Sequence, residues 1–122
     1  AFSEVGNGIA TEYFIDVSDF SEGSGYTGAK IMLMREERPT AIIASNDIMA
    51  MGVMDAIDEA QLDMPGDISV IGFDNTFAAY MRPKLTTISL PAYQVGHIGA
   101  KLILERIDKH YNGEPRMVSL AE

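Results

Sequence analysis

Two short apolar runs, residues 40–44 and 68–73, place the strongest constraint on how this chain can fold. Neither run contains a charged residue, and such runs are typical of strands that are covered on both faces of a parallel sheet. Parallel neighbours need a crossover connection, and the intervening residues 47–60 have the apolar spacing of a helix that begins after a potential cap, Asn46. The two runs therefore predict a β-α-β unit.

Further predicted elements continue this alternation along the chain. They lie at residues 12–17 (strand), 21–35 (helix), 85–88 (strand), 92–111 (a long amphipathic helix) and 116–120 (strand). Strands that alternate with helices favour right-handed crossovers and helices on both faces of one sheet. The sequence thus predicts the α/β class, with a doubly wound, mainly parallel sheet.

Charge and composition narrow the classes of protein to which this chain can belong. Its 122 residues suffice for about one domain, and nine basic against eighteen acidic residues give a net charge of −9. That charge repels nucleic acid and anionic membranes. Without cysteine or an apolar segment near membrane length, we expect no disulfide, thiol nucleophile, zinc-thiolate site, signal peptide or membrane span.

A glycine-rich segment raises the question of nucleotide binding. Residues Gly23–Gly28 read G-x-G-x-x-G, and Asp47 follows at about the spacing of the acidic residue in a dinucleotide-binding fingerprint. However, Asp19 and Glu22 place negative charge where a pyrophosphate would lie. The favoured interpretation is a helical turn that packs closely against a neighbour, and an NAD-binding enzyme that uses Gly23–Gly28 is the less favoured alternative.

No motif indicates catalysis or a metal site. The histidines are His97 and His110, which lie on the predicted helix 92–111 at mostly solvent-facing positions without a second ligand at suitable spacing. The sequence has no nucleophile elbow, phosphate-binding P-loop or His-Glu-x-x-His motif. We therefore predict no catalytic residue, no metal site, no cofactor and no enzymatic activity.

Three side chains follow predicted strands at their carboxyl ends: Phe20, Asn46 and Asp74. Open α/β sheets bind ligands at this edge. A carboxylate and an amide can hydrogen-bond vicinal hydroxyls, and an aromatic ring can cover the apolar face of a sugar or a flat base. The placement favours a site for a polyol-like ligand. Simpler alternatives are that Asn46 only caps a helix, Asp74 only forms a turn and Phe20 only fills the core.

Four motifs resemble those of the effector-binding region of LacI/GalR-type bacterial transcription regulators, over nearly the whole chain. They are D-F-S-E-G-S-G-Y (19–26), P-T-A-I-I-A-S-N-D-I-M-A (39–50), P-G-D-I-S-V-I-G-F-D-N (65–75) and P-K-L-T-T-I (83–88). The resemblance implies a periplasmic-binding-protein-like type I fold of two subdomains with ligand in the cleft. Residues 1–122 would be a partial effector-binding domain, mostly the second subdomain, with 91–113 crossing to the first subdomain. A DNA-binding head and the first subdomain are expected upstream of Ala1.

The resemblance also implies roles for particular residues. Phe20 would stack on the effector, Asn46 would hydrogen-bond it, and Asp74 would clamp its hydroxyls or a ring nitrogen, whereas Leu90 replaces a glutamine that many members carry. The implied partners are a sugar or similar metabolite, a second copy of the chain through helix 47–60, and DNA only through the N-terminal domain. A cytoplasmic location is expected. A periplasmic sugar-binding protein of a transporter, which shares the fold, is the alternative.

Overall fold

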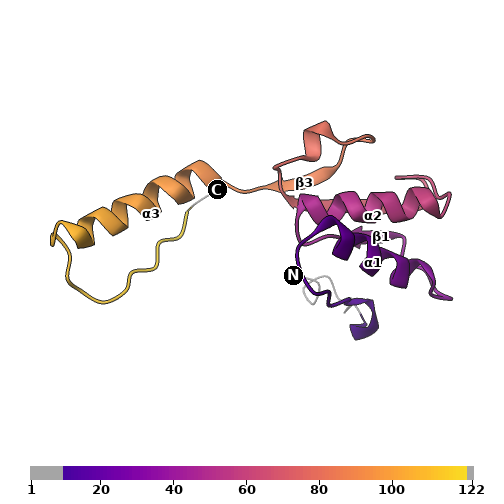
Figure 1. The fold of residues 1–122 in the computed structure, drawn as a ribbon, viewed down its shortest axis with the longest axis horizontal. Coiled ribbons are helices and arrows are strands. Elements are labelled where there is room, and N and C mark those ends of the chain that lie inside the picture. The colour runs from indigo at the N-terminus through magenta and orange to yellow at the C-terminus, as the bar shows by residue number, and fades with distance from the viewer. Residues whose placement is uncertain (1–9, 121–122) are drawn as a thin grey trace. The chain divides into compact units, whose positions relative to one another are not determined.

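The computed structural model describes residues 10–120, which form two compact units divided between Ser89 and Leu90 (Figure 1). The first unit contains helices α1 (Glu22–Leu33) and α2 (Asp47–Glu59), strands β1 (Ala41–Ile43), β2 (Ser69–Asp74) and β3 (Thr86–Ser89), and 3-10 helices at Thr11–Tyr13 and Ala78–Tyr80. The second unit contains helix α3 (Ala92–Ile107) and the segment after it.

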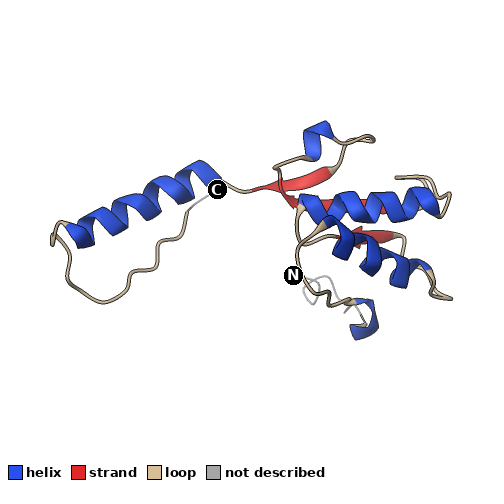
Figure 2. Cartoon of the chain, in the orientation of Figure 1, coloured by secondary structure: helices blue, strands red, loops and turns tan. Residues whose placement is uncertain are grey.

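The sheet of the first unit is parallel throughout, with its strands in the order β1-β2-β3 (Figure 2). Helix α2 connects β1 to β2, so the predicted β-α-β unit is confirmed. Ile42 of β1 lies opposite Val70 of β2, and Phe73 of β2 lies opposite Ile88 of β3. This register brings the carboxyl ends of the strands to one edge. The α/β class with a parallel sheet is confirmed.

Burial alternates along the strands, so the two faces of the sheet differ. Ile42 and Val70 are buried in an apolar cluster that also contains Ala29 of α1 and Val53 of α2. Side chains of the opposite face are exposed, and 60% of the surface of Ile43 is accessible to solvent. Both helices therefore pack on one face, and the second face is open among the described residues of the unit.

Helices α1 and α2 approach each other through two glycines. A Cβ at Gly25 would overlap the backbone of Met49, and a Cβ at Gly52 would overlap the backbone of Glu22. Only glycine allows this separation. The expectation that the 23–28 segment packs closely is confirmed, and the space beside Gly25 is filled by α2 rather than left for a phosphate.

The predicted strand at 12–17 is wrong. Residues Thr11–Tyr13 form a 3-10 helix instead, and the following residues run extended without a strand partner. Side-chain contacts hold this segment: the Tyr13 hydroxyl donates to the Glu37 carbonyl (3.0 Å), and the Arg35 guanidinium lies 5.4 Å from the Tyr13 ring centroid. A strand needs backbone hydrogen bonds to a neighbour, and residues 12–17 form no ladder with β1, the nearest edge of the sheet in chain order.

The chain after α3 also differs from prediction. The helix ends at Ile107 rather than near 111, just before Lys109 adopts a left-handed φ of 57°. Residues 116–120 form no strand; Arg116 instead donates to Glu105 (2.6 Å) and lies 3.9 Å from the Tyr111 ring centroid. These side-chain contacts hold the segment after α3 against that helix.

Helix α3 carries an apolar stripe that its own unit covers only in part. Val95 and Ile98 line a shallow groove together with Val118 and Leu120 of the returning segment. No residue of α3 is buried. The crossing of 91–113 to another subdomain stays a prediction. Within residues 10–120, no helix combines the length and apolarity that a membrane crossing needs.

The glycine contact between α1 and α2 predicts opposite effects for two similar substitutions. Gly25→Ala should lower the free energy of unfolding by about 1–3 kcal/mol or more, because the added methyl overlaps the Met49 backbone. Gly23→Ala should raise it by up to about 1 kcal/mol, because Gly23 is helical and the nearest atom, Ser21 Oγ, would lie 3.9 Å from the new Cβ. Urea denaturation followed by circular dichroism measures both, and equal effects would contradict the close crossing.

Candidate functional site

The carboxyl edge of the sheet gathers the side chains that the sequence singled out. Asn46 precedes α2, Phe20 lies just before α1, and Asp74 is the last residue of β2. The Asn46 Nδ2 atom donates to the Phe20 carbonyl at 3.2 Å. Asp74 begins a loop whose amides bond to Asp47, the neighbour of Asn46. The structure thus joins Phe20 and Asn46 directly and links Asp74 to them through Asp47.

Asn46 has a structural role in addition to any contact with ligand. Its Oδ1 atom accepts from the Met49 amide at 2.7 Å, so the predicted helix cap is present. Its Nδ2 group carries two hydrogens, and the bond to Phe20 uses one of them. The second hydrogen is available to an acceptor at the edge.

The ring of Phe20 lies in solvent rather than in the core of its unit. Phe20 has 70% of its surface accessible to solvent. Its loop is held by Asp19, whose Oδ1 atom accepts from the Ser21 amide at 2.9 Å and the Ser24 hydroxyl at 2.6 Å. Hydrogen bonds from Ser21 and Ser24 lower the pKa of Asp19 to about 2. An exposed ring on an anchored loop is available for stacking.

Asp74 combines a turn with an unusual backbone conformation. Its Oδ1 atom accepts from the Thr76 amide at 2.9 Å, so the predicted turn is present. Asp74 and Asn75 have φ values of 96° and 58°, in the region that favours glycine. Such strain concentrates at functional sites. The second carboxylate oxygen accepts no hydrogen bond within the described chain.

Asp47 is the residue at this edge that sequence reasoning missed. Its side chain is fully buried, and it accepts from the Thr87 hydroxyl at 2.6 Å and from the amides of Phe77 and Ala78 at 3.1 and 3.2 Å. Burial raises the pKa of Asp47, but these hydrogen bonds outweigh it and hold the pKa below its ordinary value. The sequence pointed to Asp47 only as the acidic residue of a dinucleotide-binding fingerprint, because its actual partners are far along the chain.

Both histidines belong to the second unit. His97 and His110 are exposed on α3 and after it, and the His97 ring stacks on Tyr93 with centroids 6.1 Å apart. Within the described residues, no group of three or more His, Asp or Glu side chains is arranged to hold a metal ion. The chemistry of the edge is therefore that of stacking and hydrogen bonding.

Comparison with known proteins identifies the class to which this fold and edge belong. The family described as the periplasmic binding protein-like domain matches residues 4–121. The chain belongs to this family.

Individual relatives give a narrower placement. The HTH-type transcriptional repressor PurR of Erwinia tasmaniensis is 41% identical over 108 residues, which are 88% of this chain and 31% of the relative. A structure described as a LacI-family transcriptional regulator from Sanguibacter keddieii is similar with a TM-score of 0.86 and 26% identity, over 94% of this chain and 43% of that one.

A ligand-bound structure is also similar. It is a LacI-family transcriptional regulator from Enterococcus faecalis with bound ribose, 39% identical with a TM-score of 0.70, over 77% of this chain and 34% of that one. Within its family, the chain groups with the effector-binding domains of LacI/GalR-type regulators. It spans between 28% and 31% of the length of the curated repressors it matches.

The hydrogen bonds of Asp19 predict a pH-dependent contribution to stability. Because its folded pKa is about 2 and its ordinary value is 3.8, the contribution is complete above about pH 4 and is lost as the pH falls toward 2. The difference in urea midpoint between the parent and Asp19→Asn should therefore shrink from pH 6 to pH 3. Asp16→Asn, which changes an exposed carboxylate nearby, serves as the control. A difference that stays constant over this range would contradict the assignment.

Proposed function

We propose that this chain is part of the effector-sensing domain of a LacI/GalR-type transcription regulator, and that Phe20, Asn46 and Asp74 bind the effector. The observation that carries the proposal is the bond from Asn46 to the Phe20 backbone, beside the loop that begins at Asp74. This bond holds the loop of Phe20 beside Asn46, and Asp74 ends the neighbouring strand β2, which supports a site along the edge at which open α/β sheets bind ligands. The domain transmits binding as a shift between conformations.

The ligand class follows from these three groups. An exposed ring covers the apolar face of a sugar or a flat base, while the amide donates and the carboxylate accepts hydrogen bonds. Bound ribose in the Enterococcus faecalis regulator supports a pentose or similar polyol. A purine-like base, which offers a flat face and ring nitrogens, is the second ligand to test.

Two rival functions receive less support. A sugar-binding protein of a transporter shares the fold, but the relatives are described as transcriptional repressors and regulators. An NAD-dependent enzyme would need the Gly23–Gly28 segment for a pyrophosphate, and α2 fills the space beside Gly25. We therefore propose ligand binding without catalysis.

The wider setting of the domain is proposed on the same basis. We place it in the cytoplasm, with DNA contacted only through a separate N-terminal domain, because a net charge of −9 opposes direct contact with phosphates. Residues 91–113 would cross to the other subdomain of the cleft.

Ligand binding is testable in a regulator-length protein that contains this chain. Asp74→Asn keeps the turn acceptor but removes the charge, so affinity for the bound ligand should fall by about 1–3 kcal/mol, or roughly 5- to 150-fold. Phe20→Leu should also weaken binding, because it removes the ring. Calorimetric titration with ribose and with a free purine base measures both effects.

Phe14→Leu is the matched control, since Phe14 is likewise exposed but lies outside the carboxyl edge. Its affinity should equal that of the parent. If Phe20→Leu and Asp74→Asn bind as tightly as the control, the effector site lies elsewhere.

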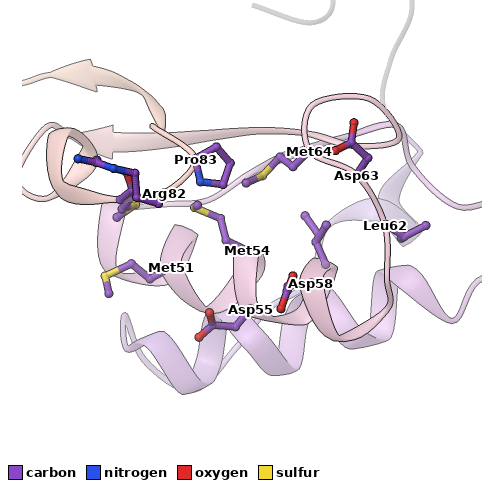
Figure 3. Close-up of a pocket in the computed structure, with 11 residues that line it drawn as sticks. Met51, Met54, Asp55, Asp58, Leu62, Asp63, Met64, Arg82 and Pro83 are labelled. Atoms are coloured by element: carbon purple, nitrogen blue, oxygen red, sulfur yellow. The ribbon is translucent and has the colours of Figure 1, made fainter.

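Helix α2 also supports the proposal of a homodimer through residues 47–60. A groove of about 490 Å³ lies between α2 and the segments at 62–64 and 81–83 (Figure 3). Methionines line it, with Asp55 and Asp58 on the α2 side and Arg82 on the other side. Most of the apolar α2 side chains are buried within the unit, including Met54, so the surface open to a second copy consists of Ile48 and Met51.

Sedimentation of the 122-residue chain tests this interface. Met51→Asp places a charge in the groove at a half-buried side chain that packs against the margin of the core, and should shift the protein from dimer to monomer at micromolar concentration while its circular dichroism spectrum stays that of the parent. Met34→Asp makes the same change at an exposed methionine outside the groove and should sediment like the parent. Identical sedimentation of all three proteins would contradict a dimer through α2.

A further inference from the structure

The loop after β2 is held almost entirely by side-chain oxygens. The Asn75 amide donates to Thr87 Oγ1 at 3.3 Å, and the Thr76 amide donates to Asp74 Oδ1 at 2.9 Å. The next two amides, those of Phe77 and Ala78, both donate to Asp47 Oδ2. Four consecutive backbone donors are therefore fixed by three side chains, and Asp47 accepts from two of them.

The Asp47 carboxylate reaches three separate elements at once. It lies in the first turn of α2, binds the loop through Oδ2, and accepts from the Thr87 hydroxyl of β3 through Oδ1. Thr87 Oγ1 in turn accepts from the Asn75 amide, which closes the network. Because Asp47 has no exposed surface, it cannot touch a ligand at the edge itself.

The core of the unit is shaped around this carboxylate. Gly72 lies in β2 beneath it, and a Cβ there would stand 2.5 Å from Asp47 Oδ1 and 2.7 Å from Leu85 Cδ2. A buried carboxylate is tolerated only when its oxygens are hydrogen-bonded. The absence of a side chain at position 72 gives it room to reach those donors.

The network explains how the strained backbone at the site persists. Positive φ values at Asp74 and Asn75 are unfavourable for residues with a side chain, and surrounding contacts must hold them in place. The contacts that do so are the hydrogen bonds donated by the backbone amides of the residues immediately after them. Without the Asp47 bonds, the loop can relax toward ordinary φ values and carry the Asp74 carboxylate away from Asn46 and Phe20.

We propose that Asp47 is a positioning residue of the ligand site: its buried carboxylate holds the loop that presents Asp74 and ties that loop to β3. The inference rests on the proposed function of the edge. Asp47 acts through the loop and makes no contact with ligand.

The first experiment requires no ligand. Amide hydrogen exchange of the 122-residue chain, followed by NMR, should be at least about fivefold faster at Phe77 and Ala78 in Asp47→Asn, with β1 and the second half of α2 unchanged. A carboxamide has one accepting oxygen in place of two, and a neutral oxygen accepts more weakly than a carboxylate, so the amides of Phe77 and Ala78 are held less tightly. Asp16→Asn makes the same change at an exposed position outside the carboxyl edge and the groove, and should leave every amide of the loop after β2 as in the parent.

Thr87→Val supplies a second variant of nearly the same shape. It removes the donor to Asp47 and the acceptor for Asn75 and should speed exchange at Asn75. Unchanged loop amides in both variants would overturn the proposal. Uniformly faster exchange across the unit would also overturn it, since that result describes loss of general stability.

The second experiment measures ligand affinity in the regulator-length protein. Titration with ribose and a purine base should show binding weakened about tenfold by Asp47→Asn and by Thr87→Val, and unchanged by Asp16→Asn. If the parent binds but the variants with a loosened loop bind equally well, positioning by Asp47 is refuted. If the parent binds neither ligand, the proposed function fails, while the exchange data still decide whether Asp47 holds the loop.

Discussion

The contact between α1 and α2 at Gly25 and Gly52 is the constraint on which the rest of the first unit depends. With the backbones of the two helices in direct contact, the chain entering α1 comes within reach of Asn46, and the Phe20 carbonyl becomes its hydrogen-bond partner. Farther along α1, Lys30 forms a 2.9 Å ion pair with Glu59, near the end of α2. A side chain at either glycine would separate the helices and with them the two elements that carry Phe20 and Asn46.

A second constraint, the buried Asp47 carboxylate, fixes the remainder of the carboxyl edge. A charge removed from water is stabilised only by well-placed donors, and here those donors come from β3 and from the loop after β2. The helix crossing and the carboxylate meet at Asn46 and Asp47, two adjacent residues that begin α2. Asn46 thus positions Phe20, and Asp47 positions the loop that begins at Asp74. These two roles account for the asparagine-aspartate pair that follows β1.

The sequence predicted the elements whose signals are local. The Asn46 cap, α2 and the strands β1 and β2 follow from apolar spacing and from residues within one turn of each boundary. The strand predictions at 12–17 and 116–120 are wrong. A strand also needs a neighbour to pair with, and strand propensity carries no information about whether such a neighbour is present. Asn46 and Asp74 follow strands as predicted, whereas the strand predicted before Phe20 is absent and Phe20 lies at the edge through the hydrogen bond from Asn46. Asp47 was missed, because Phe77 and Thr87 become its partners only when the chain folds.

The geometry of the edge also shows what more a ligand would need. Small-molecule sites usually enclose most of the ligand surface, whereas Phe20, Asn46 and Asp74 all belong to one unit and, in the proposed site, would contact a ligand from one side. An exposed ring gains its full stacking energy only when water is excluded from the opposite face of the ligand. We therefore propose that the described edge forms one wall of a cleft. The glycine contact and Asp47 hold the groups of this edge rigidly. Closing a second wall over the ligand would therefore cost conformational entropy mainly in the ligand and in the second wall, and ordering of this edge would add little to that cost.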